Sequence, residues 1–410
     1  SNVAVGYNAL DANTTASNNT AIGTSSLSAN TTGDNNTAVG YSSLQANTTG
    51  SQNAAIGTNA LLSNTTGIDN IAVGMFSLGS NTTGNRHTAI GKNALYANTT
   101  GTENTAVGKS ALGVNTTGVQ NNAIGYLSLT SCTTGSYNVA MGVGALNDTT
   151  TGESNVALGH LSSYSNITGS SNTAVGQKSF YTNTTGANNV AIGKSALYYS
   201  TTASKNTAVG TSALTANTTG AENTALGMSA LESNTTGPHN TAVGFTALAA
   251  NTTGAQNTAI GQNALLAATT ASYNVALGKN SGSGVTTGYG NTLIGYRAGT
   301  SGNALTTGYN NTFLGAHTHG TAVNTDECTA IGYDVAGSSS TTTIGYGTSD
   351  IRTSHGSTSW ATVSDERYKK DITSSTVGLS FVNALRPVTW NYKTLGELPE
   401  TFNAYKADST

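Results

Sequence analysis

The chain has 410 residues, a formal net charge of −3 and only 8% charged side chains. Its lysines and arginines are too few and too scattered to neutralise a phosphate backbone, so the composition argues against a nucleic-acid partner. No apolar run approaches the ~18–20 residues of a membrane-spanning helix, and no signal-peptide pattern opens the chain, so no membrane insertion is expected. Strictly placed apolar residues at low net charge also disfavour intrinsic disorder.

Glycine recurs every seventeen residues from Gly6 to Gly295, eighteen times without slippage. A fixed period of this kind predicts a repeat architecture, in which each unit covers its apolar face only by stacking on its neighbours. Seventeen residues are too few for a pair of helices but enough for two short strands and two turns. The sequence therefore predicts an all-β fold, a parallel β-solenoid or β-roll over residues 1–337. Because Ser1–Gly6 already follow the repeat, we expect the chain to begin inside a longer protein.

Equivalent residues of successive units form columns, and the unit Asn206–Gly220 supplies an example of each. The columns are strand asparagine (Asn206), strand threonine (Thr207), alanine (Ala208), aliphatic (Val209), repeat glycine (Gly210), leucine (Leu214), turn asparagine (Asn217) and turn glycine (Gly220). The aliphatic column holds Val, Ile, Leu or Met in all eighteen units, whereas the alanine column has one exception, Leu293. This uniformity predicts that both columns are covered from solvent.

The alanine and aliphatic columns are neighbours in sequence, so in a strand they point to opposite faces. A strand with one solvated face would alternate apolar with polar residues, and this one does not. We expect the aliphatic face to be covered by its own coil, where Leu214 returns, and the alanine face to be covered by a second copy of the chain. The sequence therefore predicts a homo-oligomer, a homotrimeric fibre.

The segment from Asn217 to Gly220 has the composition of a turn, in which asparagine bonds nearby backbone and glycine supplies a positive φ. Stacked at equal height, the strand asparagines are predicted to form a ladder of amide side chains that satisfies buried polar groups along the rod. His87 replaces one of these asparagines and is expected to substitute for its hydrogen bonds.

Two cysteines, Cys132 and Cys328, each replace an asparagine of the repeat. In a linear solenoid they lie too far apart for a disulfide, which tolerates a Cα separation of only ~7 Å. Buried free thiols and cross-links between chains at equal heights both remain open.

The chain changes character after the repeat. Residues 338–363 are rich in Ser, Thr and Gly, and we expect them to form a neck of short irregular strands. Charged residues become frequent in residues 364–410, where the repeat is absent. A short helix over Val377–Leu385 and a strand over Val388–Tyr392 predict a small α+β segment.

Two resemblances accompany these features. The Asn-Thr-Ala-Val-Gly repeat resembles the head repeats of trimeric autotransporter adhesins, which are left-handed parallel β-rolls in a trimer. The stretch Ser364-Asp-Glu-Arg-Tyr-Lys-Lys-Asp-Ile372, followed by Ala384-Leu-Arg-Pro-Val-Thr-Trp-Asn-Tyr-Lys393, resembles the start of the endosialidase-type intramolecular chaperone domain. That family terminates phage tail fibres and tailspikes, drives their trimerisation and then cuts itself off.

The second resemblance implies site residues. Cleavage in that family falls just before the motif serine, which corresponds to the bond between Val363 and Ser364. It implies that Lys369 acts as the base that activates the serine hydroxyl. Asp365 and Arg367 also match the family motif. The resemblance implies that residues 364–410 correspond to the first part of that domain.

One further candidate site is the pair His317 and His319, which a strand would place on one face. Three chains would then supply six imidazoles around an axis, enough for an octahedral metal ion. No nucleotide-binding glycine loop and no zinc spacing of cysteines occurs, and no cofactor is expected.

We interpret the chain as the shaft of a trimeric viral tail fibre that mediates host attachment. The expected partners are copies of itself, a host surface receptor or glycan, and other virion proteins, and the expected location is a virion tail fibre or otherwise extracellular. The main alternative is a bacterial cell-surface adhesin or extracellular filament subunit with the same terminal domain.

A polysaccharide-degrading tailspike is a third class, but it needs paired carboxylates. The acidic residues here are scattered over variable positions, among them Asp34, Glu103, Glu153 and Glu222.

Overall fold

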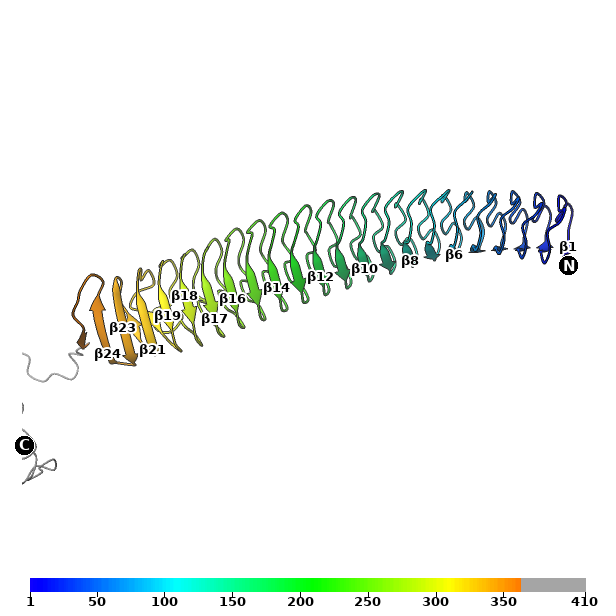
Figure 1. Ribbon diagram of the computed structural model, residues 1–410. Coiled ribbons are helices and arrows are strands. Elements are labelled where there is room, and N and C mark those ends of the chain that lie inside the picture. The colour runs from blue at the N-terminus through cyan, green and yellow to red at the C-terminus, as the bar shows by residue number, and fades with distance from the viewer. Residues whose placement is uncertain (363–410) are drawn as a thin grey trace, which may run out of the picture. The chain divides into compact units, whose positions relative to one another are not determined.

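The computed structural model describes residues 1–362, which form a long stack of coils (Figure 1). Each of the first nineteen coils contributes one strand of three residues. These are β1 (Val3–Val5), β2 (Thr20–Ile22), β3 (Thr37–Val39), β4 (Ala54–Ile56), β5 (Ile71–Val73), β6 (Thr88–Ile90), β7 (Thr105–Val107), β8 (Asn122–Ile124), β9 (Val139–Met141), β10 (Val156–Leu158), β11 (Thr173–Val175), β12 (Val190–Ile192), β13 (Thr207–Val209), β14 (Thr224–Leu226), β15 (Thr241–Val243), β16 (Thr258–Ile260), β17 (Val275–Leu277), β18 (Thr292–Ile294) and β19 (Thr312–Leu314). The described residues contain no helix, and the predicted all-β parallel solenoid is confirmed.

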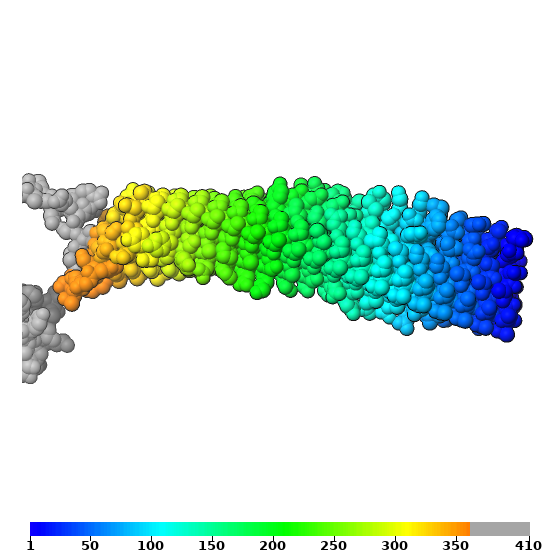
Figure 2. Space-filling view, turned by 90° about the horizontal axis from the view of Figure 1, so that it is seen from above, coloured from blue at the N-terminus to red at the C-terminus, as the bar shows by residue number. Residues whose placement is uncertain are grey.

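Successive strands pair in parallel, and each residue faces its equivalent in the next coil. Between β13 and β14, for example, Ala208 pairs with Ala225 and Val209 with Leu226. Because neighbouring strands lie ~4.8 Å apart, the parallel strands from β1 to β23 extend over about 95 Å. The coils pack into a continuous rod in the space-filling view (Figure 2).

Each coil has one strand, so the expectation of two short strands per unit was wrong. The rest of each coil, residues 210–223 in the coil that begins with β13, consists of consecutive turns and is called the return limb. Three of its non-glycine positions have a left-handed backbone. In one coil these positions are Ser212 (φ 58), Leu214 (φ 52) and Glu222 (φ 60). Such residues cannot continue an extended strand, because a strand requires a negative φ at each position.

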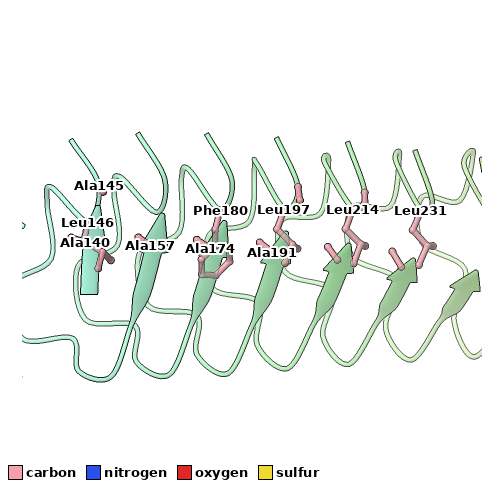
Figure 3. Close-up of a cluster of buried hydrophobic side chains, with 14 of the residues drawn as sticks. Ala140, Ala145, Leu146, Ala157, Ala174, Phe180, Ala191, Leu197, Leu214 and Leu231 are labelled. Carbon is pink, nitrogen blue, oxygen red and sulfur yellow. The ribbon is translucent and has the colours of Figure 1, made fainter. Parts of the chain in front are cut away.

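The core of each coil is formed by the alanine and leucine columns. Ala191 and Leu197 point toward one another across a coil, and both are fully buried, as are their equivalents in the coils that follow the first (Figure 3). The aliphatic column points outward, so the predicted assignment of the two faces was wrong. The interior of a coil is narrow, and once leucine fills it only a methyl group fits on the facing strand.

Two asparagine ladders run along the inside of the stack. The backbone N–H of Asn206 donates to Oδ1 of Asn189 (3.0 Å), and its Nδ2 donates to the carbonyl oxygen of Gly220 (3.0 Å). The turn asparagines form a second ladder, in which Nδ2 of Asn234 donates to Oδ1 of Asn217 (2.9 Å). The predicted strand ladder is therefore confirmed, and the turn asparagines add a second one beside it.

Glycine predominates in the two glycine columns for different reasons. Gly210 has a φ of 137, and a Cβ there would lie 2.5 Å from the carbonyl oxygen of Gly227. Gly220 has no positive φ, contrary to expectation, but a Cβ would lie 2.7 Å from the carbonyl oxygen of Gly237 in the next coil and 2.5 Å from Oδ1 of Asn217 in its own turn. Close approach of stacked coils, rather than backbone handedness, therefore explains the turn glycine.

The stack ends in a modified region. Strand β20 (His319–Gly320) pairs with β22 (Ala336–Gly337), while β21 (Thr329–Tyr333) pairs in parallel with β23 (Thr341–Tyr346). An antiparallel hairpin joins β23 to β24 (Ser349–Ser354), and β25 (Ala361–Thr362) pairs with β24. The main sheet thus runs on past residue 337. The helix and strand expected over Val377–Leu385 and Val388–Tyr392 lie outside the described residues.

Candidate functional site

The most unusual surface of the solenoid is the outer sheet face, formed by the strand threonine and aliphatic columns. It carries no charged side chain in any parallel strand from β1 to β23. Many of its aliphatic side chains are exposed, namely Val5, Ile22, Ile56, Ile90, Ile124, Met141, Ile192, Leu226, Ile260, Leu277, Leu314 and Ile344. Contiguous apolar surface of this kind marks a site of interaction.

Charged residues lie on other parts of the coil. Lys92, Lys109, Lys194 and Lys279 directly follow a repeat glycine, and a further group occupies the turn that precedes the strand asparagine. Arg86 pairs with Glu103 (2.6 Å) in the next coil, and Lys205 pairs with Glu222 (3.0 Å). Hydrogen bonds from the amide of Gln120 and then from the guanidinium of Arg86 hold the pKa of the Glu103 carboxyl below its usual range. Each of these carboxylates therefore has a partner that stabilises its charge, which suits cross-coil contacts better than hydrolysis.

Both cysteines lie inside the coils. Sγ of Cys132 donates to the carbonyl oxygen of Gly135 (3.4 Å), as the turn asparagine it replaces would do. Burial raises the pKa of Cys132 and that of Cys328 to about 12. Cross-links between chains are therefore excluded as a role for these thiols, because neither one reaches the surface or ionises readily.

His317 and His319 occupy different surroundings. The ring of His317 lies edge-on to both Tyr296 and Tyr333, and its Nδ1 is 2.8 Å from Oγ of Ser301. Strand β20 begins at His319, and Thr318 between the two histidines is buried. Within residues 1–362, no group of three or more His, Cys, Asp or Glu side chains could hold a metal ion. A metal shared by three chains stays a prediction.

The residues implied in self-cleavage, Ser364, Asp365, Arg367 and Lys369, lie outside the described part of the chain. The last described strand, β25, ends at Thr362, directly before the expected cleavage site. Residues 364–406 match the family model described as chaperone of endosialidase. The sequence resemblance at the C-terminus is therefore confirmed, and the chaperone segment follows immediately on the solenoid.

The other comparisons add no relative. No curated protein and no solved structure matches the chain. In the part of the chain that the structure describes, no helix has the length and apolar character needed to cross a membrane.

Sequence reasoning missed a stack of tyrosines on the return limb. The rings of Tyr164 and Tyr181 stack with centroids 5.5 Å apart, and those of Tyr181 and Tyr198 stack at 5.1 Å. Nζ of Lys178 lies 5.8 Å from the centroid of the Tyr181 ring. The signal was present in the sequence, because the three tyrosines are seventeen residues apart and so occupy one column.

Proposed function

We propose that the chain is the shaft of a homotrimeric fibre, of the kind found in viral tails, that holds a host-binding element away from its point of attachment. The observation that carries this proposal is the chaperone-of-endosialidase match directly after a solenoid of nineteen three-residue strands. Short-range contacts between successive coils make such a stack stiff and extended, which suits a spacer. A host receptor or glycan and other virion proteins are the proposed partners.

The chaperone segment is proposed to assemble the trimer and then to cut the chain before Ser364. A serine hydroxyl is a poor nucleophile until a neutral lysine takes its proton, and Lys369 stands five residues further on. The serine oxygen would attack the Val363 carbonyl carbon and displace the peptide nitrogen, which leaves as the protonated amine. Water then hydrolyses the resulting ester, leaving a carboxylate on Val363 and the restored hydroxyl on Ser364.

A cell-surface adhesin or extracellular filament subunit is the second candidate. The observation that favours it is the resemblance of the repeat to adhesin head repeats, which are also trimeric β-rolls. The flanking sequence distinguishes the two, because a virion protein carries an N-terminal virion anchor whereas an adhesin carries a signal peptide and a membrane anchor.

The test is the mass of the expressed full-length protein, measured native and denatured, beside the variants Ser364→Ala and Lys370→Ala. We expect wild type and Lys370→Ala to form native trimers whose chains end at Val363, because Lys370 is an adjacent lysine without a proposed role. Ser364→Ala should form a trimer of uncut chains. A wild-type protein that is monomeric with intact chains would contradict both parts of the proposal.

A further inference from the structure

In this solenoid the larger aliphatic side chains are exposed and the small alanines are buried, which is the reverse of the usual distribution. Ile192 is 39% exposed and Leu226 is 47% exposed, whereas the alanines beside them are fully buried. A single exposed aliphatic residue is ordinary, but a column repeated in every parallel strand is not. We infer that the outer sheet face is the contact between copies of this chain, and this inference rests on the trimer proposed above.

The size of the face fits a stable interface. The five residues from the strand threonine to the residue after the repeat glycine, which include the three-residue strand, span about 13 Å at ~3.3 Å per residue. Over the roughly 95 Å of the parallel sheet this gives on the order of 1,200 Å² per chain. Stable protein interfaces bury about 800 Å² per partner, so the face is large enough to hold copies together.

The spacing between aliphatic side chains on this face favours a second copy of the chain as the binding partner. Equivalent aliphatic side chains recur at the coil spacing of ~4.8 Å, and a partner that contacts all of them equally must share that spacing. Another copy of the chain has the same spacing by construction and presents the same apolar column. The strand positions of the face are uncharged, so the centre of such an interface holds no like charges opposite each other. Lys92, Lys109, Lys194 and Lys279 each follow a repeat glycine at the edge of the face and are exposed, so their ammonium groups can remain in solvent.

Other surfaces of the coil fit this role less well. The alanine column is fully buried inside its own coil and cannot contact a neighbour. The ion pair between Lys205 and Glu222 belongs to a turn whose side chains are exposed and charged. The outer sheet face is therefore the surface of the described residues that combines length, uniformity and apolar character.

Thiol protection tests the inference. Single variants Ile192→Cys and Leu226→Cys place a thiol on the outer sheet face, and Tyr199→Cys places one on the return limb of the same coil as Ile192, where Tyr199 is 54% exposed. The native thiols of Cys132 and Cys328 are buried and add little background. Purified protein is treated with a maleimide, native and denatured, after its native mass has been measured.

In a trimer, we expect the Ile192→Cys and Leu226→Cys thiols to react at least about tenfold more slowly than the Tyr199→Cys thiol, and all three to react equally after denaturation. Because only copies of the chain are present, such protection identifies a second copy as the covering partner. A trimer in which all three thiols react equally fast would overturn the interface and leave the proposed assembly intact. A monomer by mass would overturn the proposed assembly, and the interface with it.

Discussion

At the scale of single residues, His87 shows which hydrogen bonds a side chain in the strand asparagine ladder must make. The backbone N–H of Asn104 donates to Nδ1 of His87 (3.2 Å), so the ring proton resides on Nε2 and is donated to the carbonyl oxygen of Gly101 (2.7 Å). The two ring nitrogens thus replace the oxygen and the nitrogen of the asparagine amide. The expected role of His87 as a hydrogen-bonding substitute is confirmed. Protonation at Nδ1 would remove the acceptor.

His87 should make the rod sensitive to acid. Burial lowers its pKa from 6.5 to about 4, so the unfolded chain binds this proton more readily than the folded chain. The stabilisation is complete above pH 6.5 and is lost as the pH falls toward 4. Between pH 7 and pH 4.5 the wild type should lose about 2.5 kcal/mol more unfolding free energy than His87→Asn. Denaturant titrations at the two pH values measure this difference, and equal losses would show that His87 is not held neutral.

Gaps in the turn ladder leave specific atoms without partners. Oδ1 of Asn115 is buried and unpaired because the next coil has Cys132, and Oδ1 of Asn251 is unpaired because the next coil has Ala268. An asparagine at either position would supply the missing N–H donor.

Cys132→Asn should therefore raise the free energy of unfolding by about 1 kcal/mol, because the Thr149 hydroxyl in the following coil can donate to the new oxygen. Ala268→Asn is the matched control, since Val285 follows it and would leave the new oxygen unpaired. We expect no net gain there. Thermal unfolding compares the two, and an equal gain at both sites would show that pairing of the new oxygen does not matter.

At the scale of the coil, the return limb contains leucines whose backbone conformation is energetically unfavourable. The leucine column has a left-handed backbone, with φ 52 at Leu214 and φ 53 at Leu248. This conformation costs a branched side chain about 1–3 kcal/mol. Leu214 and Leu248 are fully buried, and burying a leucine is worth about 1.5–3 kcal/mol, so the two terms are comparable. Gly282 (φ 60) and Gly299 (φ 76) occupy the column in the last two regular units, where glycine adopts a left-handed backbone without that cost.

The two glycine columns should respond differently to alanine. Gly210→Ala should cost about 3 kcal/mol or more, because it combines a disfavoured φ with a Cβ pressed against Gly227. Gly220→Ala should cost less, since Ala203 and Ala271 already occupy the turn glycine column. Urea unfolding of the two variants decides the matter. Equal losses would show that φ adds nothing to the cost of steric contact.

At the scale of the whole solenoid, register is the property that every coil must preserve. All pairings from β1 to β18 shift by seventeen residues, so both ladders and all three apolar columns stay aligned together. The spacing between β18 and β19 is twenty residues, yet Thr292 still pairs with Thr312. An insertion is thus accommodated in the turns while the strand register is kept.

Deletion of whole coils should therefore be tolerated. Removal of residues 194–261, four complete units, joins Gly193 to Gln262 in phase and should shorten the rod by about 19 Å without loss of cooperative unfolding. Removal of residues 194–253 breaks the phase and should leave misfolded or aggregated protein. Small-angle scattering and circular dichroism measure both. A stable rod from the out-of-phase deletion would contradict the need for register.

The sequence by itself determined the period, the solenoid, the asparagine ladder and the chaperone segment, because each of these follows from residues repeated or spaced along the chain. Only the tertiary structure decided which apolar column faces inward. Val209 and Ala208 are both apolar, and alternation in a strand says that they face opposite ways without saying which way. The narrow interior, already filled by Leu214, admits a methyl group and excludes a larger side chain, so the aliphatic column is placed on the outside.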